Sequence, residues 1–449
     1  MSETGRLMVS ISGVRGMLGA GMNPEAAARW TAAFARTLSP GKVVVGRDTR
    51  ASGPALASAV HGALRFAGFD VIELGIAATP TVEIAVRDLG ASGGIIITAS
   101  HNDERWNALK FLGSAGEFID AGAVEAVRGR VEEGGPLFEA PGRIGGYELF
   151  DGADLAHIER IVGLPLIDAE AIGEARLKAV VDCVNGAGSR IVPSLLRRLR
   201  VETIELYTDI DAPFPRDPEP RPAMLGELAG AVLASGADIG FATDPDADRL
   251  VVVDGQGKVL SEELTLSLAA DFVLSREKGP VAANLSTTRR IEDIAKLHGV
   301  RAFRSKVGEA NVIALMKERG AVIGGEGNGG VIYPPVHYGR DAMTGIALIL
   351  QHIVSSGEPL ARLVARLPRY EIVKEKFAFS GDFESLTERL REAFGGEYNL
   401  LDGIRIDTEG GWVHVRRSNT EPVVRIIAEA PTGAEAEDLV RRAAGALRE

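Results

Sequence analysis

The residues best placed for chemistry follow a short apolar run in the first quarter of the chain. The run Gly94 to Ile97 ends in three isoleucines and carries no charge, which predicts a buried strand, and Ser100 and His101 come just after it. Open α/β sheets place reactive groups on such loops, at the carboxyl ends of strands. A serine hydroxyl is a weak nucleophile alone, but it can carry a phosphoryl group where cations such as Lys110 surround it. Taken alone, the Ser-His-Asn tripeptide would favour a polar turn with a solvated lysine.

Three aspartates form a second candidate site. Asp244, Asp246 and Asp248 alternate directly after the predicted strand at 239–242, so three carboxylates converge on a small volume. Such crowding is costly without a cation, and oxygen-only ligands suit Mg²⁺ or Ca²⁺ rather than zinc. An EF-hand is excluded because no glycine and glutamate follow at its spacing. The structural alternative is an Asp-rich turn held by local backbone hydrogen bonds.

Two further loops are rich in hydrogen-bonding groups. The glycine-rich stretch 324–330 contains Glu326, and by itself it indicates a tight turn or a weak phosphate cradle without the Walker lysine. The turn 416–422 contains two arginines, a serine, an asparagine and a threonine, which fit a phosphate dianion, and Arg425 can add a second fork. An ordinary hairpin turn is the alternative for the second loop.

Composition limits the class of protein. With 449 residues the chain is too long for one ordinary domain, and 45% hydrophobic with 25% charged residues is typical of a soluble globular protein. The net charge of −12 argues against a nucleic-acid partner but allows anionic small substrates at a local cluster of cations. A lone cysteine, Cys183, the lack of a signal peptide and the lack of an 18-residue apolar run predict a cytoplasmic protein without membrane spans.

Strands and helices alternate through most of the chain and then change pattern. A helix is expected to begin at Pro24 with Asn23 as its cap, and the Gly- and Pro-rich stretch 134–146 is expected to be a linker. The alternation predicts βαβ units with mixed or parallel sheets. From about Tyr370 a series of strands ends in one helix, which predicts a small α+β domain.

A weak internal repeat relates the first three loops, because each follows an apolar strand. The sequence therefore predicts an α/β protein with three similar α/β domains with mixed sheets around a central cleft, plus a C-terminal α+β domain. The expected boundaries, in chain order, are 1–146 with the serine loop, 147–254 with the metal loop, 255–368 with the glycine-rich loop, and 369–449 with the phosphate-binding turn.

Four of these strings resemble signatures of the α-D-phosphohexomutases, the family of phosphoglucomutase, phosphomannomutase and phosphoglucosamine mutase. They are Thr-Ala-Ser-His-Asn followed by Trp-Asn-Ala-Leu-Lys, Asp-Pro-Asp-Ala-Asp-Arg, the glycine-rich loop, and Arg-Ser-Asn-Thr-Glu-Pro. They occur in family order over the whole chain. The glycine-rich loop departs from the commoner Gly-Glu-x-Ser-Gly-His, with Asn328 at the serine and Gly330 at the histidine.

The resemblance implies a role for each matching residue. The catalytic residues would be Ser100, Lys110, Arg15, His101 and Arg249; the substrate-binding residues Lys306, Glu326, Asn328, Arg417, Ser418, Asn419, Thr420 and Arg425; and the ligands of Mg²⁺ Ser100, Asp244, Asp246 and Asp248. Arg15 stands in Ser-Gly-Val-Arg-Gly, which resembles the string whose arginine faces the phosphoserine. For Arg47 and Arg50 we expect solvated loop positions.

The resemblance also implies the reaction. A phosphorylated Ser100 would donate its phosphoryl group to a hexose phosphate, and the hexose 1,6-bisphosphate intermediate would turn around and return its other phosphate. Lys110, with a pKa lowered by neighbouring cations, is the expected general acid or base, and His101 is either a second candidate or an orienting residue.

The expected activity is conversion of glucosamine 6-phosphate to glucosamine 1-phosphate, because the glycine-rich loop and Trp-Asn-Ala-Leu-Lys resemble a branch assigned as phosphoglucosamine mutases. Phosphomannomutase or phosphoglucomutase activity by the same mechanism is the alternative. A phosphatase and a non-catalytic sugar-phosphate sensor are remote alternatives. The partner would be a small hexose phosphate, and the assembly a monomer or homodimer.

Overall fold

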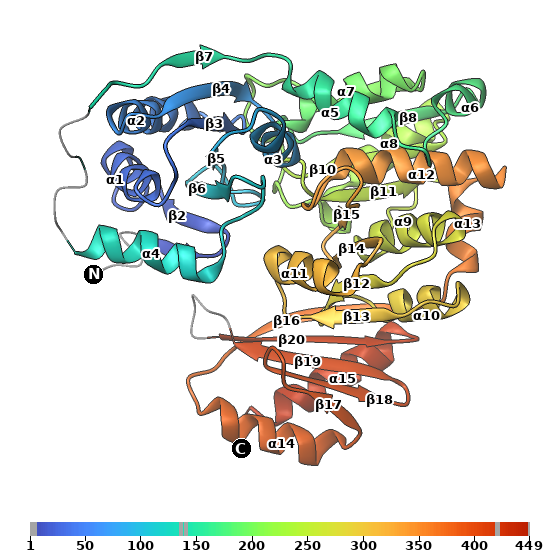
Figure 1. Cartoon of the computed structure of the whole chain (residues 1–449). Helices are drawn as coiled ribbons and strands as arrows, with labels where there is room; N and C mark the ends of the chain where they lie inside the picture. The colour runs from blue at the N-terminus through green and yellow to red at the C-terminus, as the bar shows by residue number, and fades with distance from the viewer. Residues whose placement is uncertain (1–6, 134–137, 139–141, 418–422, 448–449) are drawn as a thin grey trace. The chain divides into compact units, whose positions relative to one another are not determined.

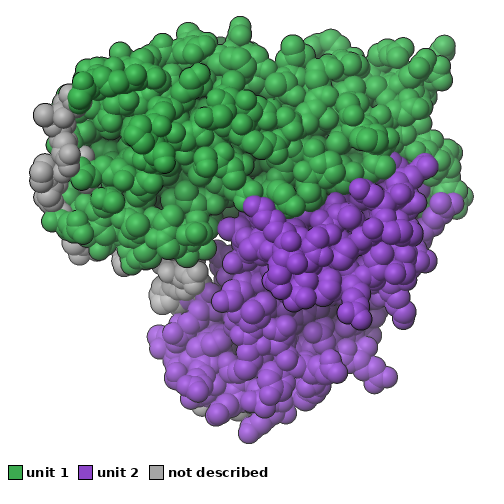
Figure 2. All heavy atoms as spheres, in the orientation of Figure 1, with its two compact units in different colours: residues 1–265, 329–362 green, residues 266–328, 363–449 purple. Residues whose placement is uncertain are grey.

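The structure is a computed structural model that describes residues 7–133, 138, 142–417 and 423–447. The chain forms two compact units, which Figure 2 colours separately: residues 1–265 with 329–362 (unit 1), and residues 266–328 with 363–449 (unit 2). Among the helices of these described residues, none is both long and apolar enough to cross a membrane.

Unit 1 begins with a seven-stranded sheet in the order β1-β2-β6-β5-β3-β4-β7 (Figure 1). In chain order its strands are β1 (Met8–Ser10), β2 (Gly13–Met17), β3 (Lys42–Arg47), β4 (Asp70–Ile76), β5 (Gly93–Ile97), β6 (Trp106–Gly113) and β7 (Tyr147–Leu149). Pairs β3–β4, β3–β5 and β4–β7 are parallel, whereas β1–β2, β2–β6 and β5–β6 are antiparallel. The sheet is therefore mixed, as the sequence predicts.

Helices cover both faces of this sheet, because its central strands are apolar on both sides. Val43 and Ile95 face a core shared with α1 (Pro24–Ala35), α2 (Gly53–Phe66) and α4 (Ala121–Glu132). The alternate residues face a second core, with α3 (Thr79–Asp88). The first helix begins as predicted, because the Asn23 side chain accepts a hydrogen bond from the Ala26 N–H.

The second sheet of unit 1 has the order β11-β10-β8-β9. Its strands are β8 (Lys178–Asp182), β9 (Glu202–Leu206), β10 (Ile239–Thr243) and β11 (Leu250–Asp254), and only the β10–β11 pair is antiparallel. The other elements of unit 1 are α5 (Ala153–Val162), α6 (Ala169–Glu174), α7 (Gly188–Arg198), the short 3₁₀ helix η2 (Pro222–Met224), α8 (Gly226–Ser235), β15 (Gly330–Ile332) and α12 (Ala342–Ser356).

Unit 2 contains a parallel group of strands, with β12 (Val281–Asn284) between β13 (Ala302–Ser305) and β14 (Ile323–Glu326). Helices α10 (Arg290–Leu297) and α11 (Glu309–Arg319) contact these strands. Two helices, α9 (Glu263–Arg276) and α13 (Leu360–Arg366), contain the residues at which the chain passes from unit 1 to unit 2.

The C-terminal part of unit 2 is an antiparallel sheet in the order β16-β20-β19-β18-β17. The strands are β16 (Glu371–Ala378), β17 (Glu397–Asn399), β18 (Ile404–Thr408), β19 (Gly411–Arg417) and β20 (Val423–Ala430). Helices α14 (Phe383–Phe394) and α15 (Gly433–Gly445) share one apolar core with this sheet. This is the α+β domain that the sequence predicts.

Two local features go beyond the sequence-based expectation. Arg15 lies on β2, opposite Ala108 of β6, because 13–17 completes an antiparallel hairpin with β1. The segment 147–149 follows the predicted boundary at 146, yet as β7 it pairs with β4 of the first sheet.

Candidate active site

Ser100 lies on the loop that follows β5 and is 6% exposed. Its φ of 51° is in the left-handed region, which costs a residue with a side chain about 1 kcal/mol or more. The loop maintains this conformation through a short chain of bonds: the Ser100 N–H donates to Thr98 Oγ1 at 3.0 Å, and Thr98 Oγ1 donates to Asp48 Oδ2 at 2.6 Å. These bonds hold the Ser100 backbone in its strained conformation.

Arg50 donates hydrogen bonds to the backbone of the same loop, which the sequence did not predict. It is 1% exposed, and its guanidinium donates to the carbonyls of Ser100 (2.7 Å), Asn102 (2.6 Å), Asp103 (2.5 Å) and Trp106 (3.1 Å). Its Nε donates to Asp48 at 2.9 Å. The expectation of a solvated Arg50 is therefore wrong, because the carbonyls of the serine loop replace water.

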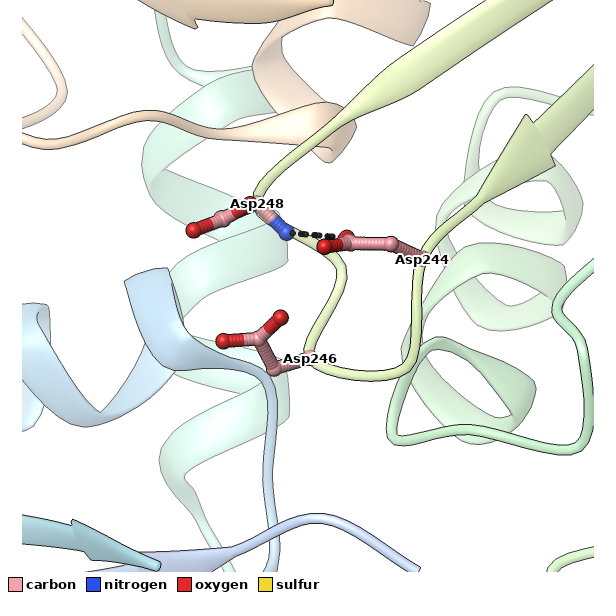
Figure 3. Close-up of side chains that lie close together, drawn as sticks. All are labelled: Asp244, Asp246 and Asp248. Carbon is pink, nitrogen blue, oxygen red and sulfur yellow. Dashed lines mark hydrogen bonds between the residues drawn. The ribbon is translucent and has the colours of Figure 1, made fainter. Parts of the chain in front are cut away.

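The three aspartates occupy the loop between β10 and β11, and Figure 3 shows their side chains around one small volume. Asp244, Asp246 and Asp248 are fully buried, and one oxygen from each lies within 4.8 Å of the others. Asp244 Oδ1 accepts bonds of 3.2 Å from the backbone N–H groups of Asp248 and Arg249. Ala247, which stands between Asp246 and Asp248, has a φ of 52°, so this loop is also held in a strained conformation.

The structure brings the serine, the lysine and the triad together. Ser100 Oγ donates to Asp244 Oδ2 at 3.2 Å, and Lys110 Nζ donates to Asp246 Oδ2 at 2.6 Å. Thr79, at the start of α3, donates its Oγ1 to the same oxygen of Asp246 at 2.7 Å. Three distant segments thus converge on one carboxylate cluster.

The hydrogen bonding and the charges of the triad fit a bound metal ion. Within the described residues, Asp246 Oδ1 and Asp248 Oδ1 are buried and accept no hydrogen bond. Burial, then the charges of Asp248 and Asp246, raise the pKa of Asp244 well above its usual range. Orphaned carboxylate oxygens and mutual repulsion are costs that a bound cation removes. The triad can therefore hold a metal ion.

The pKa of Lys110 differs from the expectation. Burial, the largest single influence, lowers it, but Asp246 and Asp248 together outweigh burial and raise the pKa above its usual value. The prediction of a lowered pKa assumed that cations were the nearest charges, whereas Nζ lies 2.6 Å from Asp246 and 3.9 Å from Asp248. The group is thus an ammonium ion at neutral pH.

Two arginines contact the neighbours of Ser100, one on the serine loop and one at the triad. Arg15 donates to Asn102 Oδ1 at 2.6 Å, and burial, then the charge of Arg249, lower its pKa. Arg249 lies 3.9 Å from Asp244 and 3.7 Å from Asp248, and its Nη1 donates to Glu219 at 3.2 Å. Both predicted cations are therefore close to the place where a phosphoryl group on Ser100 would lie.

His101 places its Nδ1 3.3 Å from Ser100 Oγ. The positive charge of Arg249, then burial and Arg15, lower the pKa of His101 well below its usual value. The imidazole is therefore neutral at neutral pH, which suits a hydrogen bond to the serine side chain.

In unit 2, Glu326 ends β14 and is 4% exposed. Its Oε1 accepts a bond of 2.8 Å from Asn284 Nδ2 and one of 3.0 Å from the Gly308 N–H. Asn328 Nδ2 lies 3.5 Å from Oε2. Asn284 was not predicted, and its place at the end of β12, parallel to β14, is the signal that could have found it.

The other predicted substrate-binding residues of unit 2 are more exposed. Lys306, Arg417 and Arg425 are all solvent-exposed, and Arg417 donates to the carbonyl of Gly381. Arg425 lies on β20 opposite Arg416 of β19. Ser418, Asn419 and Thr420 lie outside the described residues.

Models of one protein family match this chain along nearly its whole length. Four phosphoglucomutase/phosphomannomutase domain models match in order: alpha/beta/alpha domain I over residues 6–136, domain II over 156–257, domain III over 262–370, and the C-terminal domain over 372–446.

Individual proteins agree with the family models. A relative named "Probable phosphoglucosamine mutase" from Methanopyrus kandleri is 35% identical and covers 98% of each chain. A phosphoglucomutase/phosphomannomutase from Thermococcus kodakarensis is 36% identical over 95% of each chain. The crystal structure of a phosphoglucomutase/phosphomannomutase family protein from Burkholderia thailandensis is 31% identical, covers 98% of each chain and has a TM-score of 0.85.

The chain belongs to the phosphoglucomutase/phosphomannomutase family and is a phosphohexomutase, an isomerase of hexose phosphates. The predicted family, fold class and enzyme class are confirmed.

Proposed function

We propose that this enzyme moves a phosphoryl group between the 1- and 6-positions of a hexose phosphate through a phosphoserine at Ser100. The observation that carries the proposal is the contact of Ser100 Oγ with Asp244, in a cluster that also holds Lys110. A serine beside buried carboxylates gains nothing as a nucleophile unless cations neutralise the site. Lys110, Arg15 and Arg249 provide three such cations, and the orphaned aspartate oxygens provide a place for a fourth.

Each half-reaction conserves atoms and charge. The bond between the phosphorus and Ser100 Oγ breaks, a bond to a free sugar hydroxyl forms, and the hydroxyl loses its proton while the serine oxygen gains one. Lys110 is the residue we propose for this proton exchange: its ammonium form donates a proton to the departing serine oxygen, and the amine so formed takes the proton that the sugar hydroxyl loses. In the return half-reaction the sugar bisphosphate gives its other phosphate back to Ser100.

We propose Mg²⁺ as the ion held by Asp244, Asp246 and Asp248, with one oxygen of the phosphoserine as a further ligand. It would supply neutralisation of the charge on the transferred group. Arg15 and Arg249 would spread the remaining charge, and the hydrogen bond from Ser100 Oγ to Asp244 Oδ2 keeps the serine oxygen beside the triad.

From unit 2 we propose two contributions to substrate binding. Glu326 would accept hydrogen bonds from sugar hydroxyls, with Asn328 beside it and Lys306 adding a cation. Arg417, Ser418, Asn419, Thr420 and Arg425 would bind the phosphate that does not react. A grip on that phosphate serves either orientation of the sugar, which a reversible 1,6-transfer requires.

We propose glucosamine phosphate as the preferred substrate, with mannose and glucose phosphates as the alternative. A carboxylate at Glu326 favours a 2-ammonium group, and Gly330 leaves room where the commoner family pattern has histidine. The Methanopyrus kandleri relative carries the phosphoglucosamine name, whereas the Thermococcus kodakarensis relative carries the phosphoglucomutase/phosphomannomutase name.

Two measurements test the proposal. Intact-mass analysis of the purified enzyme should show one added phosphoryl group after incubation with glucose 1,6-bisphosphate, and none in Ser100→Ala. A panel of glucosamine, glucose and mannose 6-phosphates should give the highest kcat/KM for glucosamine 6-phosphate. Steady release of inorganic phosphate in place of isomer would indicate a phosphatase, and binding without turnover would indicate a sensor.

A further inference from the structure

Besides Lys110, a second cation donates a hydrogen bond to the aspartate triad, and it comes from a segment that no predicted motif includes. Arg340 lies in the turn before α12, is 8% exposed, and donates Nη2 to Asp248 Oδ2 at 2.6 Å. The contact has the same length as the bond from Lys110 Nζ to Asp246 Oδ2. Two neighbouring carboxylates of the triad therefore each give one oxygen to a fixed protein cation.

The second oxygen of each of these two carboxylates, Oδ1, is in the same situation in Asp246 and in Asp248. In the described part of the chain, Oδ1 of both Asp246 and Asp248 is buried and without a hydrogen bond. An ion bound there would find one available oxygen on each carboxylate. Monodentate ligands suit the octahedral coordination of Mg²⁺, whereas Ca²⁺ takes six to eight oxygens and often binds carboxylates through both.

Arg340 is held in place by its own neighbour. Asp341 Oδ2 accepts a bond of 2.9 Å from His157 Nε2 of α5 and a further bond from the Thr344 hydroxyl, and its Oδ1 caps α12 by accepting from the Met343 N–H at 2.9 Å. The Asp341 N–H donates to Val331 at 2.9 Å. A buried residue bonded this often fixes the backbone on which Arg340 stands.

Another buried contact holds the same turn to the first sheet's helix α3. His337 Nδ1 lies 3.2 Å from Glu83 Oε2, and its Nε2 lies 3.6 Å from Asp341. All three side chains are almost completely buried. The position of the Arg340 guanidinium is therefore determined by α3, α5 and α12, and not by the metal loop alone.

We propose that Arg340 is a positioning residue of the metal site: it occupies Asp248 Oδ2, confines Asp248 to one ligand oxygen, and so favours Mg²⁺ over Ca²⁺. The inference rests on the proposed metal site. This effect differs from simple charge repulsion, in which any nearby cation would weaken the binding of Mg²⁺ and of Ca²⁺ by the same factor. Only a cation bonded to a triad oxygen changes how that carboxylate can coordinate.

The test is calorimetric titration of Mg²⁺ and of Ca²⁺ into metal-free full-length enzyme, at one phosphorylation state of Ser100 verified by intact mass. In Arg340→Met, Asp248 can coordinate through both oxygens. The preference for Mg²⁺ over Ca²⁺ should fall by about tenfold or more, the scale of losing a partner that orients a metal ligand. The matched control is Arg15→Met, which removes a nearby buried cation that bonds to Asn102 and not to the triad. There both affinities should change together and their ratio should stay the same.

The outcomes separate this inference from the proposed function. An unchanged ratio in Arg340→Met overturns the inference while leaving the metal site intact, and a wild-type enzyme that binds neither ion overturns both. If Arg340→Met does not fold, as judged by circular dichroism, Asp341→Asn is titrated instead. It keeps the arginine but weakens its anchor, so a smaller fall in the ratio supports the inference and an unchanged ratio overturns it.

Discussion

The serine loop of unit 1 and the two strands that flank the proposed phosphate-binding turn of unit 2 differ in how their side chains are held. Ser100 is buried and strained, and its loop is held by four hydrogen bonds from Arg50 and by the Thr98–Asp48 pair. Arg417 and Arg425 are exposed on the strands that flank their turn. A group that transfers phosphoryl must be in place beforehand, because a small misplacement is costly. Under the proposed function Arg417 and Arg425 only hold a phosphate, and such groups can remain in water until the substrate arrives.

Glu326 shares features with both regions. It belongs to unit 2, yet it is buried and held by Asn284 and the Gly308 N–H. Recognition of a sugar hydroxyl requires an oriented oxygen, as catalysis does. The free energy that depends on this contact is smaller than the stabilisation needed to break a phosphate ester. We therefore expect substitutions to reduce catalytic efficiency most at the serine loop, less at the phosphate turn and least at Glu326.

The largest effect is expected for Ser100→Ala. Turnover in a coupled mutase assay should be lost almost completely, since the proposed mechanism passes the phosphoryl group through Ser100 Oγ, while the melting temperature should change little. Ser58→Ala, on the exposed side of α2, is the control and should keep full activity. Mutase activity near the wild-type level in Ser100→Ala would overturn the phosphoserine mechanism.

A smaller but still large effect is expected for Arg50→Lys. Lysine has three donors on one atom and cannot reproduce the guanidinium's contacts with four carbonyls and Asp48. The serine loop should relax, and kcat should fall by roughly 10²-fold. Arg47→Lys is the control, because Arg47 makes a single bond to the Asp48 carbonyl. If both variants have the same kcat, the loop does not depend on Arg50.

Arg417→Ala should affect binding more than chemistry. Loss of one charge-assisted fork to phosphate should raise KM by about tenfold, with a smaller change in kcat. The control is Arg441→Ala, an exposed arginine of α15 paired with Asp438. A fall in kcat at constant KM would place Arg417 in the chemical step and remove the distinction between the two regions.

Glu326→Gln should have the smallest effect and should appear in selectivity. The amide keeps the shape but loses the charge that favours a 2-ammonium group, so the preference for glucosamine 6-phosphate should shrink by several-fold, with turnover on glucose 6-phosphate largely kept. Glu318→Gln on α11 is the exposed control. A preference that survives in Glu326→Gln would assign sugar selection to another residue.

Several features could be predicted from the sequence because they depend on near neighbours. The cap at Asn23, the buried strand before Ser100 and the triad at alternate positions are set by residues a few places apart. The strings that resemble phosphohexomutase signatures are local in the same sense. Family, fold class and enzyme class therefore follow from the sequence alone.

The supports of the site depend on residues far apart in the chain. Arg50 meets the Ser100 loop across 50 positions, Thr79 meets Asp246 across 167, and Arg340 meets Asp248 across 92. No local spacing encodes these pairs, and only packing of the sheets and helices brings them within hydrogen-bond distance. The pKa of Lys110 has the same origin: the sequence shows which charges exist, but the distance from Nζ to each one decides whether the pKa rises or falls.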